Sequence, residues 1–61
     1  MSSLRFKAWL AENRITQREV RDLLGLSNAS INKKVNGKED FKLPQIRKIC
    51  ETYNISADIF L

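Results

Sequence analysis

Amide and ammonium side chains gather in the middle of the chain, between Ser27 and Lys38. This stretch contains three lysines and no acidic residue, whereas residues 51–61 contain two acids and no base. Amides and ammonium groups are the hydrogen-bonding groups that suit base edges and phosphates. The whole chain has a net charge of +4, from 11 basic and 7 acidic residues, which favours an anionic partner. Because the charge lies in mid-chain and not in a tail, we expect a structured element to carry it.

The residue types that catalysis and metal binding need are missing. The chain has no histidine and a single cysteine, Cys50, so an intramolecular disulfide and a zinc site built from Cys and His are excluded. There is no phosphate-cradling glycine loop and no pair of carboxylates with an obvious cleft. We therefore expect no enzyme activity, no metal and no cofactor. Cys50 follows Ile46 and Ile49 at helical spacing, which predicts an inert, packed thiol.

The sequence also indicates where the protein works. Arg5 and Lys7 interrupt the only early apolar stretch, so we expect no signal peptide. No run approaches the roughly 20 apolar residues that a membrane-spanning helix needs. A lone thiol suits a reducing compartment. These observations favour a cytoplasmic protein with no membrane partner.

Capping signals and apolar spacing predict an all-helical domain of five helices covering residues 1–61. Thr16 and Glu19 have the capping-box spacing that begins a helix, and Gly25 supplies a left-handed stop. Pro44 suits the first turn of a later helix. The helices are expected at about residues 3–13, 17–24, 28–35 and 44–53, with a single turn after Ser56. The aromatic residues fall on apolar stripes at helical spacing, and we expect them in the core, with Phe41 anchoring the loop before the fourth helix.

The second and third helices are joined by a very short turn. Gly25 ends one helix, Leu26 follows, and Ser27 is the N-cap of the next. Such a connection makes the two axes cross steeply, which is the helix-turn-helix geometry. Ile31 and Leu26 would pack against the second helix and fix the angle. The outer face of helix 28–35 is then free to enter a DNA major groove, which is wide enough for one helix.

This order of motifs resembles the Cro and lambda-repressor type of helix-turn-helix domain, the XRE family. The segments that carry the resemblance are Ile15–Val20, Leu23–Ser27, Ser30–Ile31 and Asn36–Lys38, and residues 40–60 resemble the fourth and fifth helices of small phage members. The resemblance covers nearly the whole chain. It implies a five-helix lambda-repressor-like fold, in which helices two and three form the helix-turn-helix. It also implies sequence-specific binding of double-stranded DNA by a phage-like transcriptional regulator, a repressor or a Cro-like protein, in the cytoplasm of a bacterial host.

The resemblance assigns roles to individual residues. The base-reading positions of the third helix fall on Asn28, Ala29 and Lys33. Asn28 can also form two hydrogen bonds with adenine from the start of a helix, and Asn32 lies one turn further along the same side. The position that contacts a phosphate and can brace the first reading residue falls on Gln17. The other phosphate contacts that we predict are Ser27, Lys34, Asn36, Lys38, Arg18 and Arg14.

Some of these assignments leave alternatives open. Lys33 can reach a guanine edge or a phosphate, and Asn32 a base, a phosphate or solvent. Arg14 and Arg18 suit either a phosphate contact or a solvated surface. The chain also departs from the family at Lys34 and Val35, where many members have an aromatic or apolar residue followed by glutamate. Lys34 would make the end of the third helix more basic, while Val35 becomes its core contact.

One recognition helix reads only about half a turn of duplex, so the resemblance predicts binding in pairs. We expect a monomer or weak homodimer that pairs on a DNA operator. Its contacts would come from residues 59–61 and the approach to the fourth helix. The main alternative is a helix-turn-helix that binds a protein, such as an antirepressor. The lysines of residues 27–38 argue against that as the only role, because the cores of protein interfaces are depleted of lysine.

Overall fold

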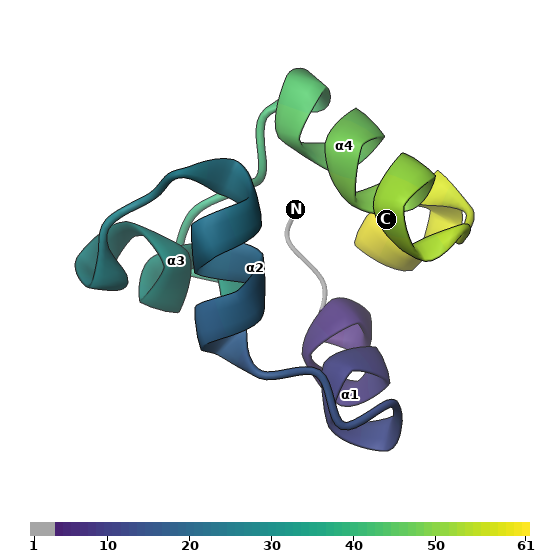
Figure 1. The fold of residues 1–61 in the computed structure, drawn as a ribbon, viewed down its shortest axis with the longest axis horizontal. Helices are drawn as coiled ribbons and strands as arrows, with labels where there is room; N and C mark the ends of the chain where they lie inside the picture. The colour runs from purple at the N-terminus through teal and green to yellow at the C-terminus, as the bar shows by residue number, and fades with distance from the viewer. Residues whose placement is uncertain (1–3) are drawn as a thin grey trace.

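The computed structural model describes residues 4–61, and in this part of the chain the secondary structure is entirely helical. Four α-helices are followed by one 3-10 turn, and the described residues contain no strand (Figure 1). The helices are α1 (Arg5–Glu12), α2 (Gln17–Leu24), α3 (Asn28–Val35) and α4 (Leu43–Tyr53), and the turn is η1 (Ala57–Phe60). The all-helical prediction is confirmed. The fifth helix is a single 3-10 turn, and Ser3, where we expected α1 to begin, lies outside the described residues.

The predicted capping residues set the ends of α2 and α3. Thr16 Oγ1 accepts a hydrogen bond from the backbone N–H of Glu19 at 3.2 Å, and Ser27 Oγ accepts one from Ser30 at 3.1 Å. Each bond satisfies a backbone donor that the first turn of a helix leaves unpaired. Gly25 ends α2 at φ 67°, a left-handed conformation that glycine adopts without a Cβ penalty. The connection from α2 to α3 is therefore as short as predicted.

The start of α4 has a cap that the sequence did not reveal. Pro44 lies in the first turn, as predicted. Gln45 turns back so that its Oε1 accepts a hydrogen bond from the backbone N–H of Lys42 at 2.9 Å. Asn54 ends the helix in the left-handed conformation at φ 54°. Ser56 Oγ then accepts from the backbone N–H of Asp58 at 3.3 Å and begins η1.

One apolar core joins all the elements. Its buried members are Phe6, Leu10, Val20, Ile31, Val35 and Ile49. Phe6 is the centre of an aromatic cluster, with ring centroids 5.4 Å from Phe41, 4.8 Å from Phe60 and 5.9 Å from Trp9. The Phe41 contact confirms that this residue anchors the loop between α3 and α4. No helix in residues 4–61 is both long and apolar enough to cross a membrane.

The packing leaves α3 at an edge of the molecule. The turn η1 packs against α1 and α4, while α2 packs against both α3 and α4. Figure 1 shows α2 between α3 and the other helices. Because α3 is covered from one side, the opposite side of this short helix is open to solvent.

Candidate nucleic-acid interface

The two sides of α3 differ sharply in chemistry. Ile31 and Val35 face the core, with 1% and 3% of their surface exposed. The exposed side chains of the helix are those of Asn28, Ala29, Asn32 and Lys33. These are the four residues that the sequence predicted as base contacts, and the structure places all of them on the solvent side. The outer face of α3 therefore presents two amides, a methyl group and an ammonium group.

Lys34 differs from its prediction. Its side chain is only 3% exposed, although we assigned it to a phosphate. The ammonium group donates to the backbone carbonyl of Asp40 at 3.0 Å and lies 3.1 Å from Glu39 Oε2. It is also 5.9 Å from the centre of the Phe41 ring. These contacts place the Lys34 side chain under the loop of residues 38–42. Lys34 holds that loop, and in this structure it is not available to a phosphate.

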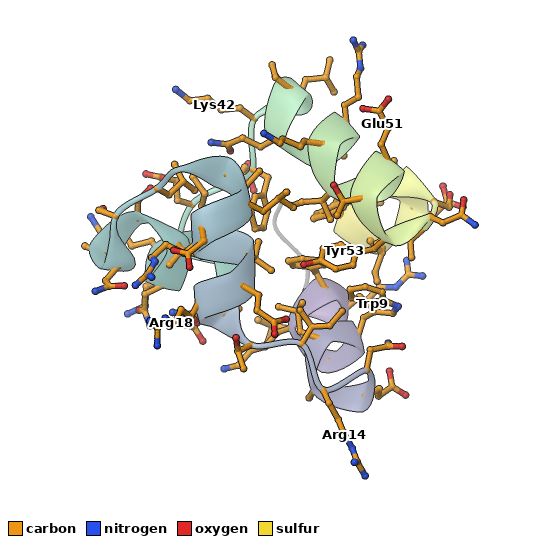
Figure 2. The ribbon with its side chains drawn as sticks, viewed as in Figure 1. Trp9, Arg14, Arg18, Lys42, Glu51 and Tyr53 are labelled. Atoms are coloured by element: carbon orange, nitrogen blue, oxygen red, sulfur yellow. The ribbon has the colours of Figure 1, made fainter. Side chains whose placement is uncertain are left out.

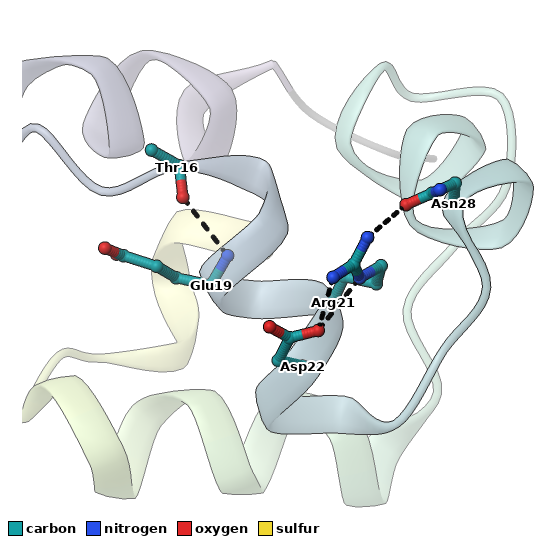
Figure 3. A network of polar contacts seen from close by, with 5 residues as sticks. All are labelled: Thr16, Glu19, Arg21, Asp22 and Asn28. Atoms are coloured by element: carbon teal, nitrogen blue, oxygen red, sulfur yellow. Dashed lines mark hydrogen bonds and ion pairs between the residues drawn. The ribbon is translucent and has the colours of Figure 1, made fainter.

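The first residue of α3 is braced from α2, by a residue we did not predict. Arg21 Nη1 donates to Asn28 Oδ1 at 2.5 Å, and Figure 3 shows this bond joining the two helices. Arg21 itself is held by Asp22, whose Oδ1 accepts from Nε at 2.9 Å and from Nη2 at 2.7 Å. The resemblance assigned the brace to Gln17, which lies one turn earlier. Gln17 is half-buried and makes no hydrogen bond to Asn28 in the described structure.

The C-terminal end of α3 gathers further polar groups. Asn36 Nδ2 donates to the backbone carbonyl of Asn32 at 2.8 Å, and Asn36 Oδ1 accepts from Lys7 Nζ at 2.6 Å. The backbone N–H of Lys38 donates to the carbonyl of Lys33 at 2.8 Å. These bonds bring an ammonium group from α1 to the end of α3. The exposed side chains of Lys7 and Lys38 therefore extend the basic face beyond the helix.

The two predicted arginine contacts lie at different distances from α3. Figure 2 shows Arg18 on the side of α2 where α3 lies, whereas Arg14 extends away from the turn before α2. Both side chains are exposed. Arg14 has a left-handed backbone at φ 56°, which is uncommon for a residue other than glycine. A partner that covers α3 would therefore meet Arg18 before Arg14. Ser27 is exposed, and its hydroxyl hydrogen can still donate although its oxygen caps α3.

Comparison with protein families gives one match. The family described as the BetR domain matches residues 3–61, which is almost the whole chain. The chain belongs to the BetR domain family. No curated protein and no solved structure matches it. Because the match spans every element from α1 to η1, the α2–α3 pair and its braces are parts of the BetR domain and not an appendage.

Two residues of this BetR domain were missed by sequence reasoning. Arg21 follows Gln17 by four positions, so it lies on the same side of α2 and one turn closer to Asn28. That spacing was a usable signal. Lys7 had no such signal, because it lies 29 positions from Asn36 and only the packing of α1 brings it there. The described residues contain no group of three or more His, Cys, Asp or Glu side chains that could hold a metal ion.

Proposed function

We propose that the chain is a sequence-specific double-stranded DNA-binding domain of the lambda-repressor-like helix-turn-helix type. It acts as a transcriptional regulator, a repressor or a Cro-like protein. The observation that carries this proposal is the exposed face of α3, with Asn28, Ala29, Asn32 and Lys33 outward and an apolar back. A single helix fits the DNA major groove, where such side chains can reach base edges. The BetR family match across α2 and α3 supports the same role.

The surrounding cations and polar groups fit the neighbouring phosphates. Arg18 lies beside α3 from α2, while Lys7 and Lys38 lie near its far end. Contacts from several elements fix the register of a helix in the groove without reading sequence. Ser27, Asn36 and Gln17 are the uncharged phosphate contacts in this proposal, and Arg14 is the outermost cation. The base edges are contacted by the side chains of Asn28, Ala29, Asn32 and Lys33.

Pairing on DNA follows from the small footprint of α3. A helix of eight residues reads about half a turn of duplex, too little for selectivity in a genome. Leu43, the first residue of α4, is 71% exposed, and Leu61 is 80% exposed. We therefore propose a weak homodimer that DNA completes. An antirepressor protein is a second partner that could cover the same apolar side chains.

Binding of random duplexes, followed by salt titration of the selected sequence, tests the proposal. With about four to five phosphates neutralised, log affinity falls against log salt with a slope of about −4. Asn28→Ala is expected to cost about 1–3 kcal/mol and to relax the preference at one base pair, whereas Lys38→Ala weakens specific and scrambled duplexes alike. Absence of binding at low salt, or binding that does not respond to salt, refutes the proposal and leaves the protein-binding alternative.

Sedimentation tests pairing separately. At micromolar concentration the free protein is expected to be monomeric or weakly associated, and two copies are expected on a duplex with two half-sites. A contact made by a few side chains falls below the roughly 1,000 Å² of a stable interface. A tight dimer without DNA contradicts the weak interface. A strict one-to-one complex on the double site removes the pairing model.

The proposed role is the binding of DNA in the cytoplasm, without catalysis and without a cofactor.

A further inference from the structure

We propose that Arg21 is a positioning residue that fixes the side-chain amide of Asn28, so that Asn28 reads a guanine edge and does not pair with adenine. This inference rests on the proposed DNA-binding function and adds a base specificity to it. It differs from the expectation, drawn from asparagine alone, that Asn28 pairs with adenine. The carrying observation is the chain of hydrogen bonds from Asp22 through Arg21 to Asn28 (Figure 3).

The guanidinium group of Arg21 is held at three nitrogen atoms. Nε and Nη2 both donate to Asp22 Oδ1, and Nη1 donates to Asn28 Oδ1. The Arg21 side chain is only 23% exposed, while that of Asp22 is 62% exposed. Neighbouring positions on a helix do not normally face each other, so Arg21 must fold along the helix surface to reach Asp22. This contact directs the third nitrogen across the turn to the start of α3.

The chemistry of the two groups settles which end of the Asn28 amide faces Arg21. A guanidinium group has only donors, whereas an amide has an acceptor oxygen and a donor nitrogen. If the Asn28 amide turned over, its NH₂ group would meet the donors of Arg21. The carbonyl oxygen must therefore face α2. The free hydrogen-bonding group of this exposed side chain is then Nδ2, which donates to no acceptor in the described structure.

This orientation selects among bases. Bidentate pairing with adenine needs the amide oxygen to accept from N6 while the amide nitrogen donates to N7. In this protein the oxygen already accepts from a cation, and the N6 hydrogens of adenine would approach the same oxygen beside that positive charge. Guanine instead presents two acceptors, N7 and O6, in the major groove. The outward NH₂ group can donate to either guanine acceptor, whereas the remaining lone pair of the oxygen lies beside the Arg21 cation, so guanine is the better match.

A comparison of base preference in two variants tests the inference. Asn28→Ala, compared with the wild type on duplexes varied at each position, identifies the base pair that Asn28 reads. At that position the wild type is expected to prefer guanine. Arg21→Met keeps an apolar stem of similar length but removes the donor, so the amide can turn and pair with adenine. The ratio of guanine to adenine affinity should then fall by about fivefold or more, which is the low end of what a bidentate pair discriminates.

Matched controls separate positioning from charge and from folding. Arg18→Met removes an exposed arginine from the same helix and should weaken both duplexes alike, without changing the ratio. Arg21→Met in the Asn28→Ala background should also leave the ratio unchanged. Asp22→Asn, which keeps Arg21 but weakens its hold, should shift the ratio in the same direction by less. Thermal unfolding of each variant confirms that the protein compared is folded.

The outcomes that overturn the inference differ from those that overturn the proposed function. An unchanged ratio in a folded, DNA-binding Arg21→Met variant means that Arg21 contributes only charge, and the inference is wrong. An adenine preference in the wild type, or no base pair whose preference depends on Asn28, overturns it as well. In all these cases the protein still binds DNA. If the wild type binds no duplex, the proposed function itself has failed.

Discussion

Lys33 and Lys34 are neighbours in sequence, yet their surroundings predict opposite effects of mutation. Lys33 is exposed on the outer face of α3, while the side chain of Lys34 is 3% exposed beneath the loop of residues 38–42. Truncation of Lys34 should therefore lower the free energy of unfolding. Truncation of Lys33 should weaken DNA binding and leave the stability nearly unchanged. The pair provides a matched comparison, because both variants lose the same formal charge.

The magnitude for Lys34→Ala comes mainly from packing. Burial stabilises by about 0.8 kcal/mol per methylene, so loss of Cγ, Cδ and Cε costs about 2.4 kcal/mol. The hydrogen bond to the Asp40 carbonyl contributes about 1.5–3 kcal/mol. The ion pair adds at most about 1 kcal/mol, because Glu39 is half exposed. These polar gains are opposed by the cost of desolvating a buried ammonium group, which is on the order of several kcal/mol. The polar contributions largely cancel, which leaves a net cost of about 2–4 kcal/mol.

Lys34→Met separates the packing contribution of the Lys34 stem from the polar contribution of its ammonium group. Methionine keeps most of the buried apolar stem and removes only the ammonium group, so its cost should stay within about 1 kcal/mol. Lys33→Ala should stay within about 0.5 kcal/mol, as surface substitutions usually do. A protein of this size has about 3–9 kcal/mol of total stability. The expected loss for Lys34→Ala is thus a large part of the whole.

Urea unfolding followed by the fluorescence of Trp9 measures these differences. Trp9 packs against Tyr53, with ring centroids 5.5 Å apart, so its surroundings change when the core opens. Salt titration of DNA binding supplies the second readout. Lys33→Met should weaken binding, while Lys34→Met should leave the salt slope as it is. Equal stability loss in Lys33→Ala and Lys34→Ala, or a lower salt slope in Lys34→Met, refutes the assignment of Lys34 to the loop.

Three further predictions concern the fold. Phe6→Ala should cost about 3–5 kcal/mol, because Phe6 lies at the centre of the aromatic cluster, and circular dichroism should then show a largely unfolded chain. Gly25→Ala should cost about 1–2 kcal/mol, because φ is 67° and a residue with a Cβ is strained in that conformation. No atom lies within 4 Å of an added Cβ, so backbone strain alone should lower the melting temperature measured by thermal unfolding. Burial, and then the charge of Glu19, raise the pKa of Tyr53 above 10.0, so its contribution to stability is complete below pH 10 and is lost as the pH rises further. Urea midpoints from pH 9 to 11.5 should therefore fall more steeply for wild type than for Tyr53→Phe, and equal slopes would contradict the shift.

Local signals made most of the fold predictable. The caps at Thr16 and Ser27 and the stop at Gly25 are short-range features, in which one residue satisfies a backbone group three or four positions away. Such features can be recognised from spacing alone. The open side of α3 could also be predicted, because Ile31 and Val35 define the buried side by their helical period. The single turn after Ser56 was also predicted from its cap, but its 3-10 type was not, because a 3-10 turn and a short α-helix begin with the same serine cap.

Lys34 shows why spacing did not suffice at the end of α3. A lysine near the C-terminus of a helix is usually exposed, since burying an ammonium group is costly. Here the cost is offset by the Asp40 carbonyl and by Glu39, both supplied by the loop that follows. Whether that loop folds back depends on Phe41, which packs on Phe6 from α1. The position of Lys34 is therefore decided by a contact between distant segments.

The brace of Asn28 shows the same limit in the site itself. The resemblance placed the brace at Gln17, because an amide at that position can hydrogen-bond the first residue of the next helix. In this chain Arg21 is one turn nearer to Asn28, and its longer side chain reaches Oδ1 while Asp22 holds it in place. A position in a family pattern fixes where a side chain leaves the backbone, but not which of two neighbouring side chains forms the hydrogen bond. That choice depends on side-chain length and on local charge. Since an arginine can only donate, this brace leaves the NH₂ group of Asn28 outward, and under the proposed function that is the group offered to DNA. If the proposal holds, two proteins with the same asparagine at this position prefer different bases when their bracing residues on α2 differ.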